Sequence, residues 1–225
     1  MEQAAAINIE EDGSEYDPEP RWPALVAVLA NGGLYMALPS ALRVGPLWLF
    51  PVLVGVLLIP AMVSNRTGHH RLNAIFGFGM SAVLTLGMII SLVLLIKALP
   101  EHKESPEALL MSAASLWLTN ILVFALWYWR LDAGGPHQRD KMTVHTGSFL
   151  FPQMTMSEDA LKDAGLIGWS PNFVDYLFLA FNTSTAFSPT DVPVIARWAK
   201  LLMMVQSLLS LLIIALLAAR AVNIL

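Results

Sequence analysis

A run of hydroxyl and carboxylate side chains lies in the turn before the last apolar segment of the chain. They belong to Thr183, Ser184, Thr185, Ser188, Thr190 and Asp191. If such oxygen atoms from several chains met around an axis, the rings of hydroxyls and the acidic ring would favour cations. In the alternative, the hydroxyl groups bond to carbonyls at the end of the preceding helix, and Asp191 caps the next one. The turn is therefore a candidate cation site with a structural alternative.

Four further polar side chains lie in the apolar segments on either side of this turn. Asp175 falls near the start of the preceding segment. If it lies at membrane depth it is a functional candidate; in the alternative, it lies at the interface and stabilises the start of the helix. In the following segment, Gln206 and Ser210 are four residues apart and share one helix face, and Ser207 is their neighbour. These three residues either line a pore or form hydrogen bonds to another helix.

The composition predicts a membrane protein. Of the 225 residues, 56% are hydrophobic and 13% are charged, and the mean hydropathy is +0.61. There is no cysteine, which excludes disulfides and thiolate chemistry. Because no nucleophile and base at recognisable spacing, no phosphate loop and no metalloprotease motif appears, we expect no enzyme activity and no metal or other cofactor. We expect the lipid bilayer as a partner, and no nucleic acid.

The apolar blocks predict an all-α polytopic membrane protein with about five transmembrane helices and one re-entrant half-helix, in the cell (inner) membrane. Residues 1–21 form an acidic tail that we expect to be disordered. Residues 22–99 hold three spans, and residues 107–225 hold the rest. The second span, residues 47–63, is the least secure because Pro51 and Pro60 allow either a kinked crossing or a re-entrant piece. The segment "FALWYWR" is typical of an interfacial aromatic belt.

The C-terminal part contains an apolar segment that is too short to cross a membrane. We divide this part into a helix at 107–130, a cap loop at 131–170, a short helix at 171–183, a turn at 184–193 and a helix at 194–222. Ser170 is the expected N-cap of the short helix, with Pro171 at the first helical position. Its apolar run of about nine residues reaches about 14 Å, half the hydrocarbon layer. The polar turn after it must therefore face protein or water.

This order of segments resembles the pore module of tetrameric potassium channels: outer helix, pore helix, selectivity filter and inner helix. "NFVDYLFLAFNTST" is similar to the pore helix and "RWAKLLMMVQSLLSLLIIALL" to the inner helix, with Ser210 where many channels have a hinge glycine and Pro193 as the distal proline. The resemblance implies a homotetramer around a pore for monovalent cations. The segments "FALWYWRLDAGGP" and "AFSPTD" also resemble segments of bacterial membrane proteins.

The filter-like segment differs from the family pattern. With Thr185 on the family's threonine, Ala186, Phe187, Ser188 and Pro189 replace valine, glycine, tyrosine and glycine. A non-glycine residue in the left-handed region costs about 1–2 kcal/mol, and proline is fixed near a φ of about −65°. We therefore predict a cation-permeable pore without the potassium signature. The alternatives are a non-conducting scaffold or accessory subunit that keeps the fold, and a small-solute transporter.

The charge distribution and the resemblance give opposite orientations. With five spans, the N-terminus, the loop at His69 and the polar turn share one side, which carries nine of the thirteen basic residues. The positive-inside rule places that side in the cytoplasm, whereas the channel resemblance places it outside. Long loops count little in the rule, which weakens the contribution of Arg139, Lys141 and Lys162. We favour the outside for the turn.

Overall fold

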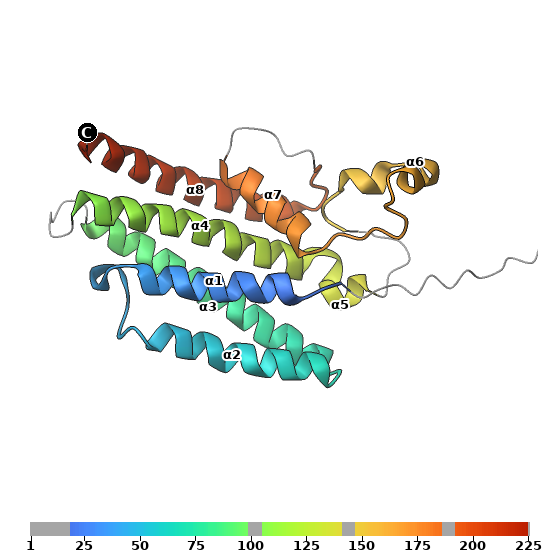
Figure 1. Cartoon of the computed structure of the whole chain (residues 1–225), viewed down its shortest axis with the longest axis horizontal. Helices are drawn as coiled ribbons and strands as arrows, with labels where there is room; N and C mark the ends of the chain where they lie inside the picture. The colour runs from blue at the N-terminus through green and yellow to red at the C-terminus, as the bar shows by residue number, and fades with distance from the viewer. Residues whose placement is uncertain (1–18, 99–104, 141–146, 186–191, 225) are drawn as a thin grey trace, which may run out of the picture.

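The structure, a computed structural model, describes residues 19–98, 105–140, 147–185 and 192–224 (Figure 1). Within them the elements are helical, apart from an isolated bridge between Phe149 and Val194. Four helices are long and apolar enough to cross a membrane: α2 (Leu49–Arg66), α3 (His70–Ala98), α4 (Pro106–Leu131) and α8 (Arg197–Ile224). The chain therefore has the helices of a multi-pass membrane protein.

The first helix is shorter than the four long helices. α1 (Trp22–Ala37) has 16 residues, which span about 24 Å, compared with about 30 Å for the hydrocarbon layer. The helix ends at Ala37 because Pro39 disfavours the helical conformation at Leu38, whose ψ is 145°. A single turn of 3-10 helix, η1 (Ser40–Leu42), follows. α1 nevertheless lies alongside the long helices, antiparallel to α2 (Figure 1).

The second apolar block forms one continuous helix despite its two prolines. Pro51 lies in the first turn of α2, where backbone N–H groups have no intrahelical partner to lose. Pro60 is accommodated inside the helix. The two alternatives for residues 47–63 are a kinked crossing and a re-entrant piece. The structure has one helix of 18 residues, which is long enough for a crossing.

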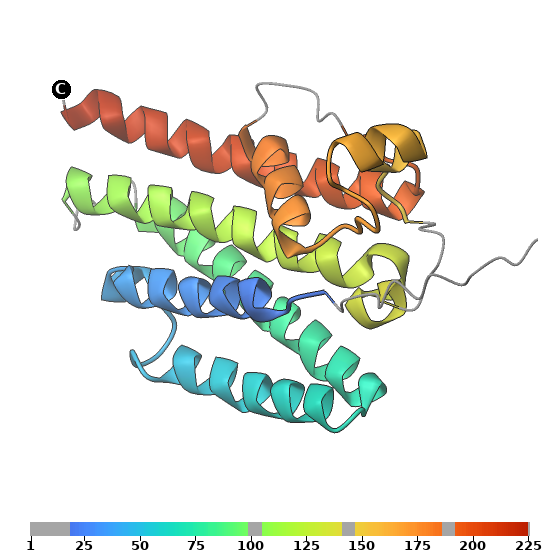
Figure 2. The same cartoon turned by 45° about the vertical axis from the view of Figure 1, so that its right-hand side comes forward.

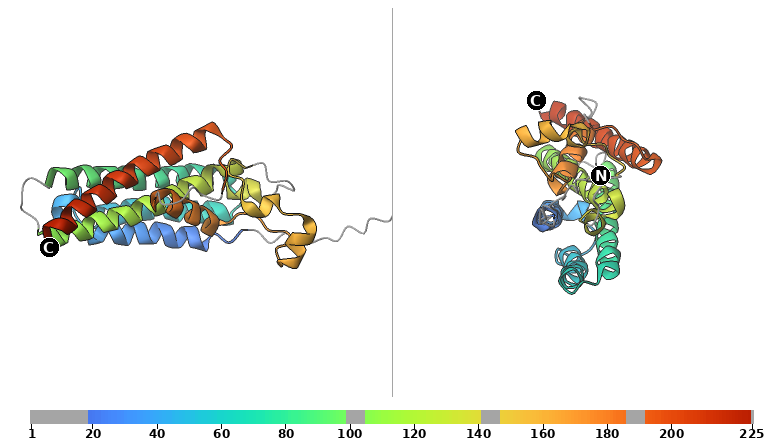
Figure 3. Two further views of the ribbon diagram at one scale, coloured as in Figure 1. Left: turned by 90° about the horizontal axis from the view of Figure 1, so that it is seen from above. Right: turned by 90° about the vertical axis from the view of Figure 1, so that its right-hand side faces the viewer.

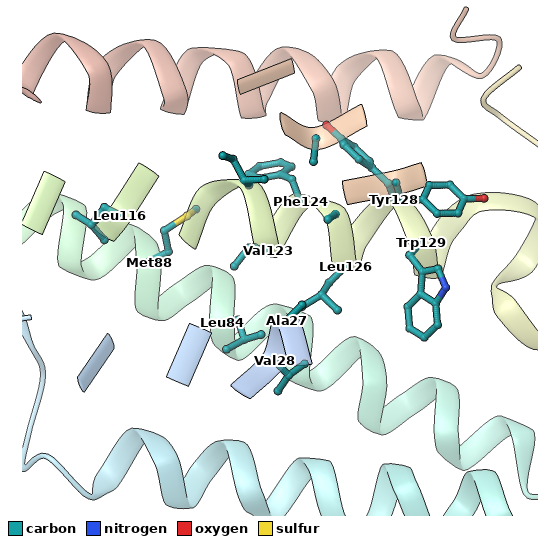
Figure 4. Packing of buried hydrophobic residues seen from close by; sticks show 14 of the residues in the cluster. Ala27, Val28, Leu84, Met88, Leu116, Val123, Phe124, Leu126, Tyr128 and Trp129 are labelled. Carbon is teal, nitrogen blue, oxygen red and sulfur yellow. The ribbon is translucent and has the colours of Figure 1, made fainter. Parts of the chain in front are cut away.

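The central helix of the bundle is α4: in an apolar window of 18 residues, 56% of its residues are buried, compared with 17% in the corresponding window of α8. α2 and α8 lie at opposite edges of the bundle (Figure 3). In Figure 4, Leu126 of α4 lies beside Ala27 of α1, while Phe124 and Tyr128 point to the opposite side. Tyr128 and Trp129, in the segment expected to form an interfacial belt, are buried against other helices.

The half-length helix α7 (Phe173–Thr185) begins two residues later than predicted. Asn172, and not Ser170, caps it: the Val174 amide donates to Asn172 Oδ1 at 2.8 Å, and the Asn172 amide donates to Asp175 Oδ2 at 2.8 Å. This reciprocal pair is a capping box. Asp175 therefore stabilises the helix start, which is the structural alternative stated for it.

The segment between α4 and α7 is a structured cap. It contains η2 (Asp132–Gly134), α5 (Pro136–Arg139), η3 (Pro152–Thr155) and α6 (Glu158–Asp163). The approach to α8 is attached to this cap, because the Leu150 amide donates to the Pro193 carbonyl at 2.9 Å and the Ile195 amide donates to the Ser148 carbonyl at 2.8 Å. Figure 2 shows the cap at the same end of the bundle as the start of α8.

Candidate functional site

The C-terminal half of α7 lies against α8, and a buried glutamine joins them. Gln206 of α8 donates from Nε2 to the Ala180 carbonyl of α7 at 2.8 Å. Its other amide atom, Oε1, accepts a hydrogen bond from the Tyr128 hydroxyl of α4. Gln206 and Tyr128 are both fully buried. One side chain therefore connects the three helices of the C-terminal module.

Serine side chains of α8 bond to the last carbonyls of α7. Ser210 donates from Oγ to the Ser184 carbonyl at 2.6 Å, and its Oγ also pairs with Ser184 Oγ. Ser207 donates to the Thr183 carbonyl at 3.4 Å. The last four carbonyls of a helix have no partner within it. The α8 side chains therefore cap the buried end of α7.

The hydroxyl groups at the end of α7 also have partners within the chain. Thr183 Oγ1 donates to the Leu179 carbonyl at 2.8 Å, and Thr185 Oγ1 donates to the Asn182 carbonyl at 3.1 Å. The structure thus brings Thr183 and Ser184 together with Ser207, Ser210 and Gln206 in one hydrogen-bonded seam. For Gln206, Ser207 and Ser210 it has the helix-to-helix bonding that the sequence left open beside pore lining. Thr183 instead bonds to a carbonyl of its own helix, the structural alternative stated for the turn.

The remaining predicted site residues lie elsewhere. Asp175 is at the opposite end of α7 from the seam. Residues 186–191 lie outside the described residues; they include Ala186, Phe187, Ser188, Pro189, Thr190 and Asp191, the larger part of the filter-like turn. The described structure thus places the two ends of the turn, at Thr185 and Val192.

The face of α8 that points away from α4 and α7 is apolar. Its exposed side chains are Leu201, Met204, Val205, Leu208, Leu211 and Leu212. Because Gln206, Ser207 and Ser210 are used in the seam, this face offers hydrocarbon to lipid or to another protein chain.

A second polar cluster, which the sequence did not predict, joins the N-terminal segment to the cap. We call it the clasp and define it by Glu19, Trp129, Asp132, Arg139 and Tyr176. Arg139 Nη2 forms a salt bridge to Glu19 Oε2 at 2.9 Å, with both side chains at most 2% exposed. Arg139 Nη1 donates to the carbonyls of Trp129 at 2.8 Å and Asp132 at 3.0 Å.

The Glu19 carboxylate is held from two sides. Trp129 Nε1 donates to Glu19 Oε1, while Arg139 holds the other oxygen. Burial raises the pKa of the Glu19 carboxyl, and the positive charge of Arg139 opposes that rise. Glu19, which we expected in the disordered tail, is instead held in place by a buried ion pair.

Asp132 organises the cap side of the clasp. Its Oδ2 accepts a hydrogen bond from the Tyr176 hydroxyl at 2.7 Å, and its Oδ1 accepts from the Ser148 amide. The Arg139 guanidinium lies 4.9 Å from the centre of the Tyr176 ring. The only sequence signal for this arrangement is "LDAGGPHQR", in which an acid and an arginine flank glycines and a proline, and that composition is equally typical of a loop.

Gly135 permits the turn from α4 into α5. Its φ is +91°, and an added Cβ would lie 3.0 Å from the Arg130 carbonyl oxygen. We expect Gly135→Ala to lower the free energy of unfolding in detergent by about 3 kcal/mol, because backbone strain and the close contact add. Gly168 is the control, since its φ is +72° but nothing lies within 4 Å of an added Cβ. Gly168→Ala should cost about 1 kcal/mol; equal losses would contradict the close contact.

Among the described residues, no three histidine, cysteine, aspartate or glutamate side chains are grouped so that they could hold a metal ion. The clasp and the seam are therefore arrangements of hydrogen bonds and ion pairs within the protein. Comparison of the chain with protein-family models, curated proteins and solved structures gave no match.

Proposed function

We propose that this protein is a channel-type membrane protein in which α7 enters the membrane as a re-entrant half-helix. In four copies, the turn after α7 would form a path for monovalent cations. The observation that carries this proposal is the position of the seam: Ser210, the partner of Ser184, lies in the middle of α8. Thirteen residues separate it from the start of α8 at Arg197, or about 20 Å along the helix.

The half-helix would favour a cation at its buried end. The C-terminal end of a helix carries roughly half a negative charge. Hydroxyl and carboxylate oxygens follow in the turn at Ser188, Thr190 and Asp191. The turn lacks both filter glycines, so the proposed path selects cations weakly and is not potassium-selective. α1, although short, serves as a fifth crossing in this arrangement.

One observation favours a second candidate, a non-conducting scaffold that keeps the fold. The hydroxyl groups of Thr183, Ser184 and Thr185 are all bonded within one chain. The exposed face of α8 is apolar and would suit packing against another membrane protein. The two candidates differ in whether the purified protein conducts.

Cation flux into liposomes containing the purified full-length protein tests the proposal. We expect flux of monovalent cations above that of empty liposomes, and we expect Asp191→Asn to reduce it at least several-fold because the acidic ring is lost. Asp163→Asn is the matched control: Asp163 is an exposed residue of α6, and this change removes the same charge from the cap. It should leave the flux unchanged.

The oligomeric state separates the outcomes further. Mass measurement of the detergent-solubilised protein should give four chains if the turn forms a central path. A monomer or dimer, or an absence of flux above empty liposomes, would refute the pore and favour the scaffold. Equal flux in the Asp191→Asn and Asp163→Asn variants would place any path elsewhere.

A further inference from the structure

A cavity of about 90 Å³ opens at the end of the bundle where α1 and α3 begin and α2 and α4 end. Four polar side chains line it, one from each of these helix ends: Arg21, Asn65, Asn73 and Arg130. The rest of the wall is mostly apolar and comes chiefly from α1 and α2, including Leu25, Leu58 and Met62. One water needs about 10–15 Å³ of such a cavity, so the space is large enough for several waters or for a small polar group.

Arg130 faces this cavity without a negative partner. Within the part of the chain that the structure describes, its guanidinium forms no salt bridge to an acidic side chain, and its Nε is buried with no hydrogen bond. The guanidinium lies over the backbone of α3 at Gly77, where an added Cβ would lie 1.8 Å from Nη1. Its nearby aromatic partner is the Trp129 ring, at 5.2 Å. Burying an unpaired charge is costly, so a counter-charge is expected in the cavity.

The acids around the cavity are already used by other groups. Asp140 forms a salt bridge with Arg21 at 3.0 Å. Glu19 pairs with Arg139, and Asp132 accepts from Tyr176. Arg21 also donates to Asn65, and it lies close enough to Arg130 for the two positive charges to repel. The cavity therefore has an excess of positive charge and of hydrogen-bond donors.

We propose that this cavity binds the phosphate group of an anionic phospholipid. Arginine side chains match the oxygens of a phosphate with paired N–H donors. The position at the common end of four helices is the depth of lipid headgroups in a spanning protein. The apolar walls formed by α1 and α2 continue from the arginines, and they suit the glycerol and the first part of the acyl chains. The inference does not depend on conduction through the C-terminal module.

Thermal unfolding of the purified full-length protein in a neutral detergent tests the site. The probes are phosphatidylglycerol, diacylglycerol of the same acyl chains, and inorganic phosphate against chloride at equal ionic strength. We expect phosphatidylglycerol to raise the unfolding temperature and diacylglycerol to leave it unchanged. In Arg130→Gln we expect the apparent affinity for phosphatidylglycerol to fall by about tenfold or more. Without lipid, this variant should be at least as stable as the natural protein, because a buried unpaired charge is gone.

Two further variants keep the outcome decisive. Arg66→Gln removes an exposed arginine from the same end of α2, outside the cavity, and should retain the full response. Arg130→Lys keeps the charge without the paired donors and should respond weakly. If inorganic phosphate stabilised the protein as much as phosphatidylglycerol does, the cavity would still be a phosphate site. The proposal that the phosphate belongs to a lipid would then be wrong. Equal responses of the natural protein and Arg130→Gln, or no response to either phosphate compound, would overturn the proposal.

Discussion

Replacing Arg139 with alanine is expected to lower the free energy of unfolding by about 3–5 kcal/mol. The change leaves the Glu19 carboxylate buried without its cation, and both side chains of the pair are at most 2% exposed. It also removes the donors to the Trp129 and Asp132 carbonyls. Unfolding of the purified protein in mixed micelles, followed by tryptophan fluorescence, measures the loss.

Arg21→Ala is the matched control for this prediction. Arg21 pairs with Asp140 at 3.0 Å, nearly the same distance as the Arg139 pair, but the two side chains are 24% and 14% exposed. We expect a loss of about 1 kcal/mol or less, because water replaces the partner. Similar losses in the two variants would contradict the importance of burial. The double variant with Glu19→Ala and Arg139→Ala should lose less than the two single changes added together, since each charge is then no longer left unpaired.

The second large effect is expected from Asp132→Asn, with a loss of about 2–3 kcal/mol. Both carboxylate oxygens accept hydrogen bonds, from the Tyr176 hydroxyl and from the Ser148 amide. An asparagine has no negative charge, and it keeps its oxygen on the Ser148 amide only by turning its NH₂ group towards the Tyr176 hydroxyl, which must then accept instead of donate. Both charge-assisted bonds are therefore lost or weakened. The Asp132 carboxylate is also packed closely against Gly147, where an added Cβ would lie 2.8 Å from Oδ2. The asparagine side chain therefore has little room to move to a better position.

Tyr176→Phe provides the comparison for Asp132→Asn. It removes a single donor and leaves Asp132 its bond to Ser148, so we expect a loss of about 1 kcal/mol. The same unfolding measurement serves for both variants. If Asp132→Asn cost no more than Tyr176→Phe, the requirement for two acceptor oxygens would be wrong.

The long helices could be predicted from hydropathy because each contains a run of apolar residues long enough to cross the hydrocarbon layer. The predicted span at 107–130 differs from α4 by one residue at each end. The sequence predicts the start of α7 two residues early because Ser170 and Asn172 are both good caps. Only the reciprocal bond from Asp175 distinguishes them, and a capping box with aspartate at its third position is a weaker pattern than one with glutamate.

The clasp and the seam required the structure for different reasons. Glu19 and Arg139 are 120 positions apart, so no local pattern relates them. Gln206 and Ser210 could be placed on one face of a helix, but the period of a helix does not say which neighbour that face meets. The contacts with Ala180 and Ser184 supply that information. The filter-like residues 186–191 stay a prediction from the sequence.

The ion pair between Glu19 and Arg139 also imposes an order on biosynthesis. Glu19 leaves the ribosome 120 residues before its partner. At about 5–20 residues per second, that delay is roughly 6–24 s. Throughout this interval α1, α2, α3 and all of α4 are made while the carboxylate stays hydrated. Membrane insertion of the first helices therefore precedes the closure of the contact that fixes the N-terminal segment to the cap.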